Sequence, residues 1–219
     1  MRRPTPRTAI TVALLGVLAL TVAACGGDGG DDGATTTTAP PPVATTSTGP
    51  ADLPDPAAWM LTAASLPAGF QQSEVAPPEV GPCNGPTDEA RATQARRART
   101  QFVGAEQVVE AVYAFRTDAE AAAFVDGIVE QVRSCEKYEV DTGDVHQTVT
   151  HSNFETAGRG DQTFAYRMIV TAPDVDERAV ANVIYARKGP NVVSVLVGGE
   201  AVGALGVEQL LDTALAKLP

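Results

Sequence analysis

Cysteines are the residues of this 219-residue chain best suited to covalent chemistry, and there are three of them: Cys25, Cys83 and Cys135. Cys25 lies next to an N-terminal apolar segment. Cys83 and Cys135 then remain as a pair in what we expect to be an exported domain, where a disulfide is the simplest outcome. Metal ligation is the alternative, but the pair lacks the close Cys-x-x-Cys spacing of many zinc sites.

The two histidines, His146 and His151, are the other side chains that could bind a metal ion. They lie five residues apart in a strand-like segment, which places them on opposite faces of a regular strand. No cysteine stands close to them in the sequence to complete a zinc site. We therefore expect solvent-exposed or capping histidines and no metal site.

Catalytic motifs are missing from the part of the sequence that follows residue 56. It contains no G-x-S-x-G, H-E-x-x-H, P-loop or G-x-G-x-x-G pattern. Asp141 and Asp144 could form a carboxylate pair, but they flank Gly143 in a polar turn, where solvation explains them better. A hydrolase would need a nucleophile and a base that the sequence does not supply. We expect a protein that is not an enzyme and that carries no cofactor.

A cluster of arginines stands out in an otherwise acidic chain: Arg91, Arg96, Arg97 and Arg99. Such a cluster could bind an anionic ligand or the acidic patch of a partner. The alternative is a solvated helix over residues 88–99, with its charges offset by Asp88, Glu89 and Glu106. If the cluster does bind an anion, Arg96, Arg97 and Arg99 are its candidate binding residues.

Aromatic residues on expected strands form a second candidate set: Tyr113, Phe115, Phe164, Tyr166 and Tyr185. Most of them should pack in the core. Any that line a concave face of a sheet would form a ligand cleft. Tyr113 and Tyr166 are the candidates that we take from this set.

The periodicity of apolar residues predicts one domain over residues 57–219. The sequence indicates helices over 57–65, from a capping box at Thr117 and Glu120 to Cys135, and over 207–218, with strands over 108–116, 138–149, 163–170, 179–187 and 192–197. Strands joined by short turns pair antiparallel. We therefore expect an α+β fold, with an antiparallel sheet of about five strands and helices packed on one face.

The N-terminus has the parts of a secretory signal peptide over residues 1–24. Three arginines precede an uncharged apolar run over residues 9–22, and the tetrad Val22-Ala23-Ala24-Cys25 follows. This tetrad resembles the bacterial lipobox, which implies cleavage before Cys25 and diacylglycerol on its sulfur. An uncleaved membrane anchor is the alternative, but the run is shorter than the ~20 residues of a spanning helix.

Residues 25–56 are expected to be the lipidated cysteine and a tether rich in Gly, Thr and Pro, a composition that does not form a packed core. The chain has a formal net charge of −11, and loss of the three signal-peptide arginines makes it −14. So acidic a protein should not bind nucleic acid through bulk charge.

Three segments resemble the extracellular sensor domain of PknH-type mycobacterial receptor kinases and its stand-alone lipoprotein relatives. They are Leu61-Thr62-Ala63-Ala64-Ser65-Leu66-Pro67, the run from Val112-Tyr113-Ala114-Phe115 to Cys135, and Asn191-Val192-Val193-Ser194-Val195. The resemblance implies an α+β sandwich with a cleft for an unknown ligand. That family commonly has two disulfides, whereas this domain has cysteines for one.

These observations predict a lipoprotein held on the extracytoplasmic face of the cell membrane by diacylglycerol on Cys25. Its domain would bind an unknown small molecule or an envelope protein without catalysing a reaction. The alternative is a carrier that moves lipid or another apolar molecule through the envelope, which requires an internal cavity of several hundred Å³.

Overall fold

The computed structural model describes residues 45–75, 78, 80–142, 145–173, 175–199 and 206–219. The signal peptide, Cys25 and the turn residues Gly143 and Asp144 lie outside these ranges. Eight strands form one sheet in which every pairing is antiparallel, in the order β1-β2-β3-β8-β7-β6-β5-β4. The strands are β1 Gln71–Ser73, β2 Arg96–Val103, β3 Gln107–Ala114, β4 Lys137–Thr142, β5 Val145–Asn153, β6 Gln162–Ala172, β7 Val175–Lys188 and β8 Asn191–Gly199.

The expected sheet of about five strands is thus too small by three. The short edge strand β1 was missed, and β4 and β5 form a hairpin where one strand over 138–149 was expected. The largest error concerns β2, because its run of arginines was interpreted as part of a polar helix over 88–99. In the structure only Asp88–Arg91 (α1) is helical there, and residues 96–103 pair with β3 along their whole length.

Helix α2, Asp118–Arg133, begins at the expected capping box. The Thr117 hydroxyl accepts a hydrogen bond from the backbone N–H of Glu120, and the Glu120 carboxylate accepts one from the N–H of Thr117. Its apolar stripe, which includes Val125 and Ile128, packs on one face of the sheet with alternate residues of β3, β6 and β7. The helix connects β3 in the middle of the sheet to β4 at its edge.

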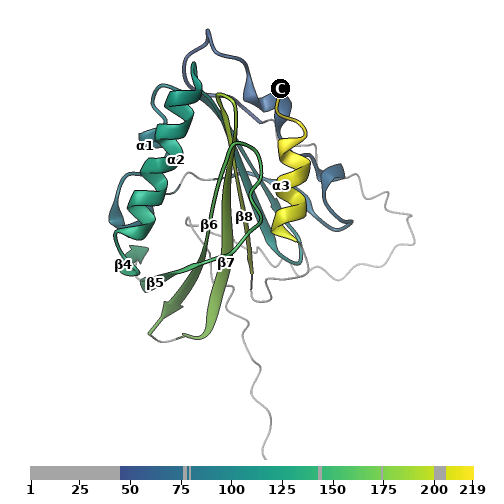
Figure 1. Cartoon of the computed structure of the whole chain (residues 1–219). Helices are drawn as coiled ribbons and strands as arrows, with labels where there is room; N and C mark the ends of the chain where they lie inside the picture. The colour runs from purple at the N-terminus through teal and green to yellow at the C-terminus, as the bar shows by residue number, and fades with distance from the viewer. Residues whose placement is uncertain (1–44, 76–77, 79, 143–144, 174, 200–205) are drawn as a thin grey trace, which may run out of the picture.

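Helix α3, Val207–Leu215, covers the other face of the sheet, against Phe102, Val108 and Ile184. Figure 1 shows α2 and α3 on opposite sides of the central strands. The expectation that the helices cover one face was therefore wrong. The physical reason lies in strands such as β3, where Ala111 and Tyr113 are buried on one face and Val108 and Val112 on the other, so both faces need a cover.

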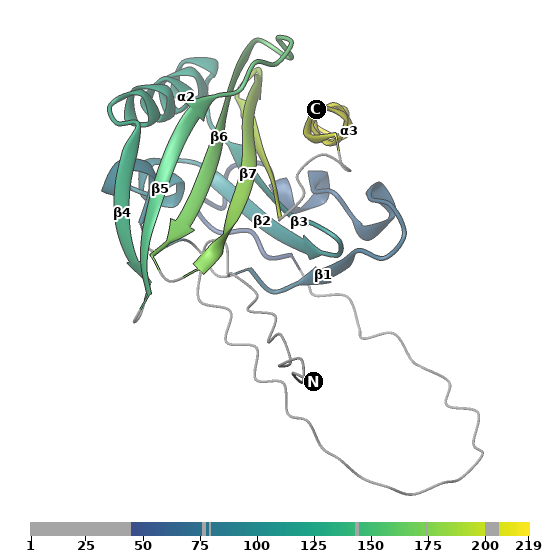
Figure 2. The same cartoon turned by 90° about the horizontal axis from the view of Figure 1, so that it is seen from below.

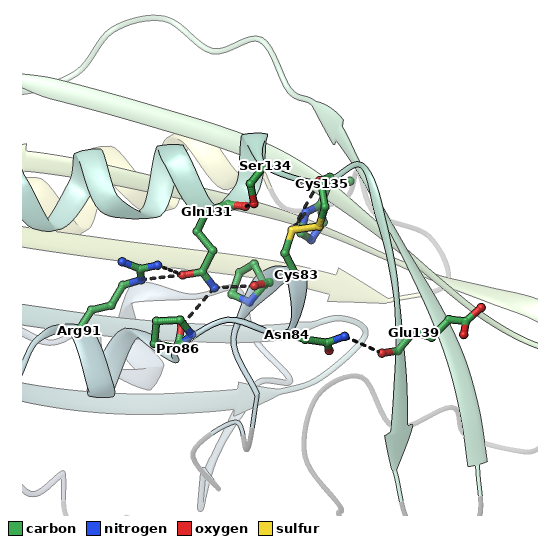
Figure 3. Close-up of a disulfide and its surroundings, with 10 residues drawn as sticks. Cys83, Asn84, Pro86, Arg91, Gln131, Ser134, Cys135 and Glu139 are labelled. Atoms are coloured by element: carbon green, nitrogen blue, oxygen red, sulfur yellow. Dashed lines mark hydrogen bonds between the residues drawn. A yellow bond between two sulfur atoms is a disulfide. The ribbon is translucent and has the colours of Figure 1, made fainter.

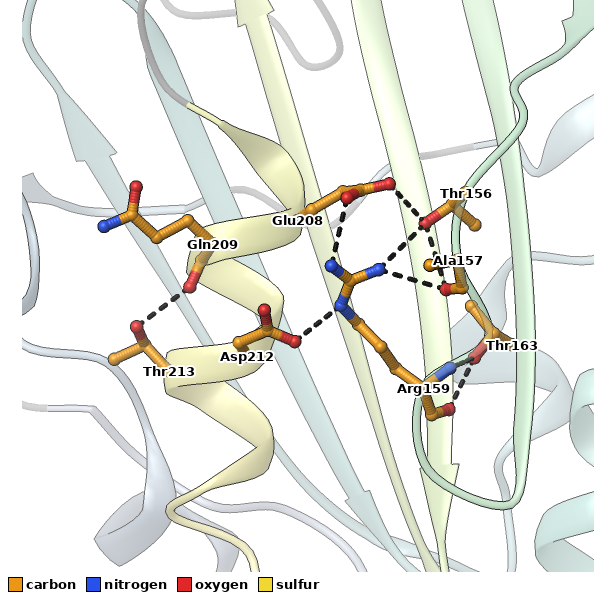
Figure 4. Close-up of polar contacts among 8 residues, drawn as sticks. All are labelled: Thr156, Ala157, Arg159, Thr163, Glu208, Gln209, Asp212 and Thr213. Atoms are coloured by element: carbon orange, nitrogen blue, oxygen red, sulfur yellow. Dashed lines mark hydrogen bonds and ion pairs between the residues drawn. The ribbon is translucent and has the colours of Figure 1, made fainter.

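A salt-bridged loop fastens α3 to the sheet. The guanidinium of Arg159 donates to Glu208 at 3.0 Å and to Asp212 at 2.5 Å, both on α3, and to the backbone oxygen of Ala157 at 3.0 Å (Figure 4). The loop before β6 is thereby joined to the helix by charge-assisted hydrogen bonds. Among the helices described, none is long and apolar enough to cross a membrane.

Single-turn helices occur before β1, at Pro56–Trp59 and Ala63–Ser65, where one short helix over 57–65 was expected. Chain further upstream also touches the domain, although residues 25–56 were assigned to the tether. Thr48 exchanges backbone hydrogen bonds with Arg97 of β2, and Asp55 binds Arg96 at 2.9 Å. The last dozen residues of the expected tether therefore contact the sheet.

Candidate ligand cleft

An open cleft of about 550 Å³ lies on the face of the sheet that α2 covers, beside the edge formed by β1 and β2. Its walls carry polar groups from three segments, namely the chain at 45–48, β1 with the residues after it, and β2. Arg97 and Arg99 project into it from β2, and Tyr113 from β3. This volume is in the range of small-molecule sites.

A smaller pocket of about 80 Å³ adjoins this cleft, and the two share Arg99, Ala111 and Tyr113 as wall residues. We call it the tyrosine pocket, because Tyr113, Tyr138, Tyr166 and Tyr185 all line it. Its floor is the sheet, with residues from β3, β4, β6, β7 and β8. Its roof is the loop that contains Gly81, Pro82, Thr87 and Asp88.

Asp88 brings a carboxylate into the tyrosine pocket. It accepts hydrogen bonds from the hydroxyls of Tyr185 at 2.7 Å and Tyr113 at 3.5 Å. Burial raises the pKa of Asp88 from 3.8 to about 6, with a further rise from the charge of Glu89, while the hydroxyl of Tyr185 opposes the shift. Burial also raises the pKa values of Tyr113 and Tyr185 well above the ordinary range, so both phenols keep their protons as donors.

The roof is fixed to α2 and β4 by covalent and polar links (Figure 3). Cys83 and Cys135 form a disulfide, in agreement with the pairing expected from the sequence, and their Cα atoms are 6.0 Å apart. Gln131 of α2 donates to the backbone oxygens of Pro82 and Pro86 and accepts from Arg91. A Cβ at Gly85 would lie 2.7 Å from the terminal amide of Gln131, so a larger residue there would displace this amide from its contacts with the roof.

The fold of this domain was compared with known proteins. No family model matches the chain, and no curated protein matches it. The crystal structure of the extracellular domain of PknH from Mycobacterium tuberculosis superposes with a TM-score of 0.53 at 16% sequence identity, covering 73% of this chain and 90% of that one. The chain has a PknH-like sensor-domain fold. The resemblance seen in the sequence is therefore confirmed at the level of the fold.

A putative uncharacterized protein from Mycobacterium smegmatis is more distant, with a TM-score of 0.41 and 13% identity over 70% of this chain and 91% of that one. At such identities the PknH-like fold identifies an architecture and leaves the ligand to be argued from the site itself.

The structure separates the arginines that the sequence grouped as one cluster. Arg99 pairs with Glu89 at 2.8 Å in the wall of the cleft, and Arg97 lines the cleft beside it. Arg96 points to the opposite face of β2, where it binds Asp55 and the backbone oxygen of Leu53. Two of the three candidates thus face the cleft, and the third holds the N-terminal chain against the sheet.

The candidate tyrosines Tyr113 and Tyr166 both line the tyrosine pocket. Phe115 and Phe164 instead pack with the core under α2. Three residues of the site were not predicted from the sequence: Tyr138 and Gln131, which were not among the candidates, and Asp88, which was expected to be a solvated acid. Only Gln131 had a signal in the sequence: it is a polar residue within the apolar stripe of a helix, which indicates a buried polar contact.

The histidines behave differently from each other. His146 is exposed on β5 and contacts Asp141 at 2.8 Å, which raises its pKa. His151 is buried rather than exposed and lies between the rings of Tyr138 and Tyr166. It bonds the backbone of Val132 in the last turn of α2, which agrees with the expected capping role. Burial lowers the pKa of His151. Within the described ranges no group of three His, Cys, Asp or Glu side chains could hold a metal ion.

Proposed function

We propose that the chain is a lipoprotein, anchored through Cys25 on the extracytoplasmic face of the membrane, whose domain binds a ligand or partner without catalysing a reaction. The signal peptide and lipobox pattern support the anchor, and the PknH-like fold is consistent with a domain outside the cytoplasm. The observation that carries the proposal is the cleft of about 550 Å³ that opens beside the tyrosine pocket.

The chemistry of the walls favours binding over catalysis. Ser194 lines the tyrosine pocket, but the residues lining the two spaces include no histidine to activate it. The hydroxyls of Tyr113 and Tyr185 already donate to Asp88. What remains is a set of directional polar groups above an aromatic floor, which is the usual composition of a binding site.

The carrier hypothesis has no observation in its favour. It required an internal apolar cavity of several hundred Å³, whereas the tyrosine pocket measures about 80 Å³. The larger cleft is open and not internal, and its walls combine charged side chains such as Arg97, Arg99 and Glu89 with apolar ones, so it does not enclose a lipid chain.

Native mass spectrometry of the full chain, produced in an actinobacterial host and extracted in mild detergent, tests the proposal. A retained extra mass is expected, since a cleft of this size should keep part of its ligand. Ala111→Phe fills the wall shared by the cleft and the tyrosine pocket and should abolish that mass. Gln209→Phe, which adds the same ring to an exposed position of α3 on the other face, should retain it.

A retained mass in the wild type and both variants would place the ligand elsewhere and contradict the proposal. The mass before and after ester cleavage, which removes the two O-linked acyl chains and leaves the glyceryl thioether, would report the lipid on Cys25 in the same experiment.

A further inference from the structure

The chain has four tyrosines in 219 residues, and all four line the tyrosine pocket. They come from four different strands: Tyr113 from β3, Tyr138 from β4, Tyr166 from β6 and Tyr185 from β7. The faces of aromatic rings carry negative charge density and attract cations, and several rings around one small space are a common way to hold a quaternary ammonium. The pocket thus has walls suited to a cation.

The charge inside the pocket points the same way. Among the residues that the structure describes, Asp88 takes part in no ion pair, because the nearby guanidinium of Arg99 binds Glu89. The carboxylate therefore has phenol donors and feels the charge of Arg99 only from a distance, without a direct ion pair. A buried anion without a counter-ion costs free energy, and a ligand that supplies the counter-charge recovers it.

Resting on the ligand-binding function proposed above, we propose that the tyrosine pocket holds the head of a ligand that carries an ammonium group, with Asp88 as its counter-ion. A space of about 80 Å³ holds a small head group and little more, so the rest of the ligand must extend past Tyr113 into the outer cleft. The class of ligand is an amine or quaternary ammonium compound with a polar body.

The outer cleft is suited to that polar body. Arg97 lines it and makes one long hydrogen bond, to the backbone oxygen of Ala92 at 3.5 Å, while no acidic side chain in the described ranges pairs with it. It is therefore available to a carboxylate, phosphate or hydroxyl on the ligand.

An anionic head group would not fit the tyrosine pocket. Asp88 and Glu89 would repel it, and Arg99 is already neutralised by Glu89 at 2.8 Å. A neutral head group would leave Asp88 without a counter-charge, as it is in the free protein. The charge of the head group is thus the property that the pocket selects.

Calorimetric titration of the full chain tests the inference. The probes are choline chloride and ethylammonium chloride, with 3,3-dimethylbutan-1-ol as the uncharged counterpart of choline. At least one cation should bind, and the uncharged alcohol should bind about tenfold more weakly or not at all. Asp88→Asn keeps the size of the side chain and should weaken the cation about tenfold. Asp126→Asn, the same change at an exposed position of α2, should leave binding unchanged.

The pH dependence provides a second readout. The groups facing the carboxyl of Asp88 are Tyr113, Tyr166, Tyr185, Glu89 and Arg99. Of these, the tyrosines stay protonated through the acid range, because burial raises their pKa values. Since the pKa of Asp88 is about 6, cation binding should weaken as the pH falls through that value, and the Asp88→Asn variant should lack this dependence.

Two failures are distinguishable. If neither cation binds, or if cation binding is the same in Asp88→Asn, the ammonium assignment is wrong. If at the same time the wild type retains a mass that Ala111→Phe loses, the cleft still binds a ligand and only its class was misassigned. If no cation binds and the wild type also retains no mass that Ala111→Phe loses, the proposed ligand-binding function is wrong as well.

Discussion

The hydroxyl of Tyr185 lies 2.7 Å from a carboxylate oxygen of Asp88, although 97 positions separate the two residues in the sequence. Asp88 belongs to the roof of the tyrosine pocket and Tyr185 to its floor, on β7. The contact joins the roof to the floor through a carboxylate whose charged form is disfavoured by burial. A group held in an unfavourable environment is a physical sign of a functional site, because folding alone gives no reason for the charge.

Asp88→Asn should therefore stabilise the protein at neutral pH. The pKa of Asp88 in the folded state, about 6, lies above its ordinary value of 3.8, so folding favours the protonated form. Its stabilising contribution is complete below about pH 4 and is lost as the pH rises through about 6. The variant should gain about 2–3 kcal/mol at neutral pH over the wild type, as measured by chemical denaturation. Equal stability across this range would contradict the buried charge.

Glu110 should make the stability fall at higher pH. It is fully buried on the α3 side of β3, where it accepts a hydrogen bond from the N–H of Leu61 at 2.6 Å. Burial raises its pKa from 4.5 to about 8, while the hydrogen bond from Leu61 and the charge of Lys217 oppose the shift. Its stabilising contribution is thus complete below about pH 4.5 and is lost progressively as the pH rises to about 8.

The test is to compare the wild type with Glu110→Gln across that range. Between about pH 4.5 and 9 the wild type should lose on the order of 4–5 kcal/mol relative to the Glu110→Gln variant. Glu130→Gln, at an exposed position of α2, should follow the wild type. Parallel curves for all three proteins would mean that Glu110 does not titrate there.

The disulfide should contribute to stability and also hold the roof of the tyrosine pocket. Reducing Cys83–Cys135, or replacing both cysteines by serine, frees a loop spanning 52 positions and should cost up to about 4 kcal/mol. Hydrogen exchange should accelerate around Gly85 and Asn84, where the roof turns. Cys25→Ser should leave both measurements unchanged. A reduced protein with the same midpoint and the same exchange in the roof would show that the other contacts are sufficient.

Arg159→Ala should loosen α3. The guanidinium joins two acidic residues of the helix, Glu208 and Asp212, to the loop before β6 (Figure 4). Faster amide exchange within α3 and a lower Tm are expected. Arg116→Ala removes a single exposed pair with Asp52 and should have little effect on either quantity. If the two variants behave alike, the loop does not fasten the helix.

Regular patterns made much of the fold predictable. The capping box fixed the start of α2, and strict alternation identified β6, with Phe164, Tyr166, Met168 and Val170 all on the α2 side. The turn at Gly189 and Pro190 placed the hairpin of β7 and β8, because Gly189 takes the left-handed conformation that the turn requires, with φ of 57°.

Strand β2 was hidden because its charge pattern outweighed its alternation. Arg96 is paired with Asp55, 41 positions away, and Arg99 with Glu89 of α1, so these two charges are neutralised by contacts that alternation along the strand does not indicate. The tyrosine pocket was unpredictable for the same reason. Its aromatic residues come from four strands of one twisted sheet, in which β3 runs at an angle to β4, β6 and β7 (Figure 2). Its carboxylate comes from the roof, which a disulfide ties to the residue after α2. Local sequence patterns contain no information on such contacts between residues that are distant in the sequence.

The most direct test of the binding site uses the tyrosines themselves. With fluorotyrosine incorporated, the full chain should give four ¹⁹F resonances, all from the walls of one pocket. Adding a polar extract of the host envelope should shift resonances in the wild type and in Gln209→Phe but not in Ala111→Phe. Four resonances that stay in place, under conditions where native mass spectrometry detects a bound ligand, would contradict the account.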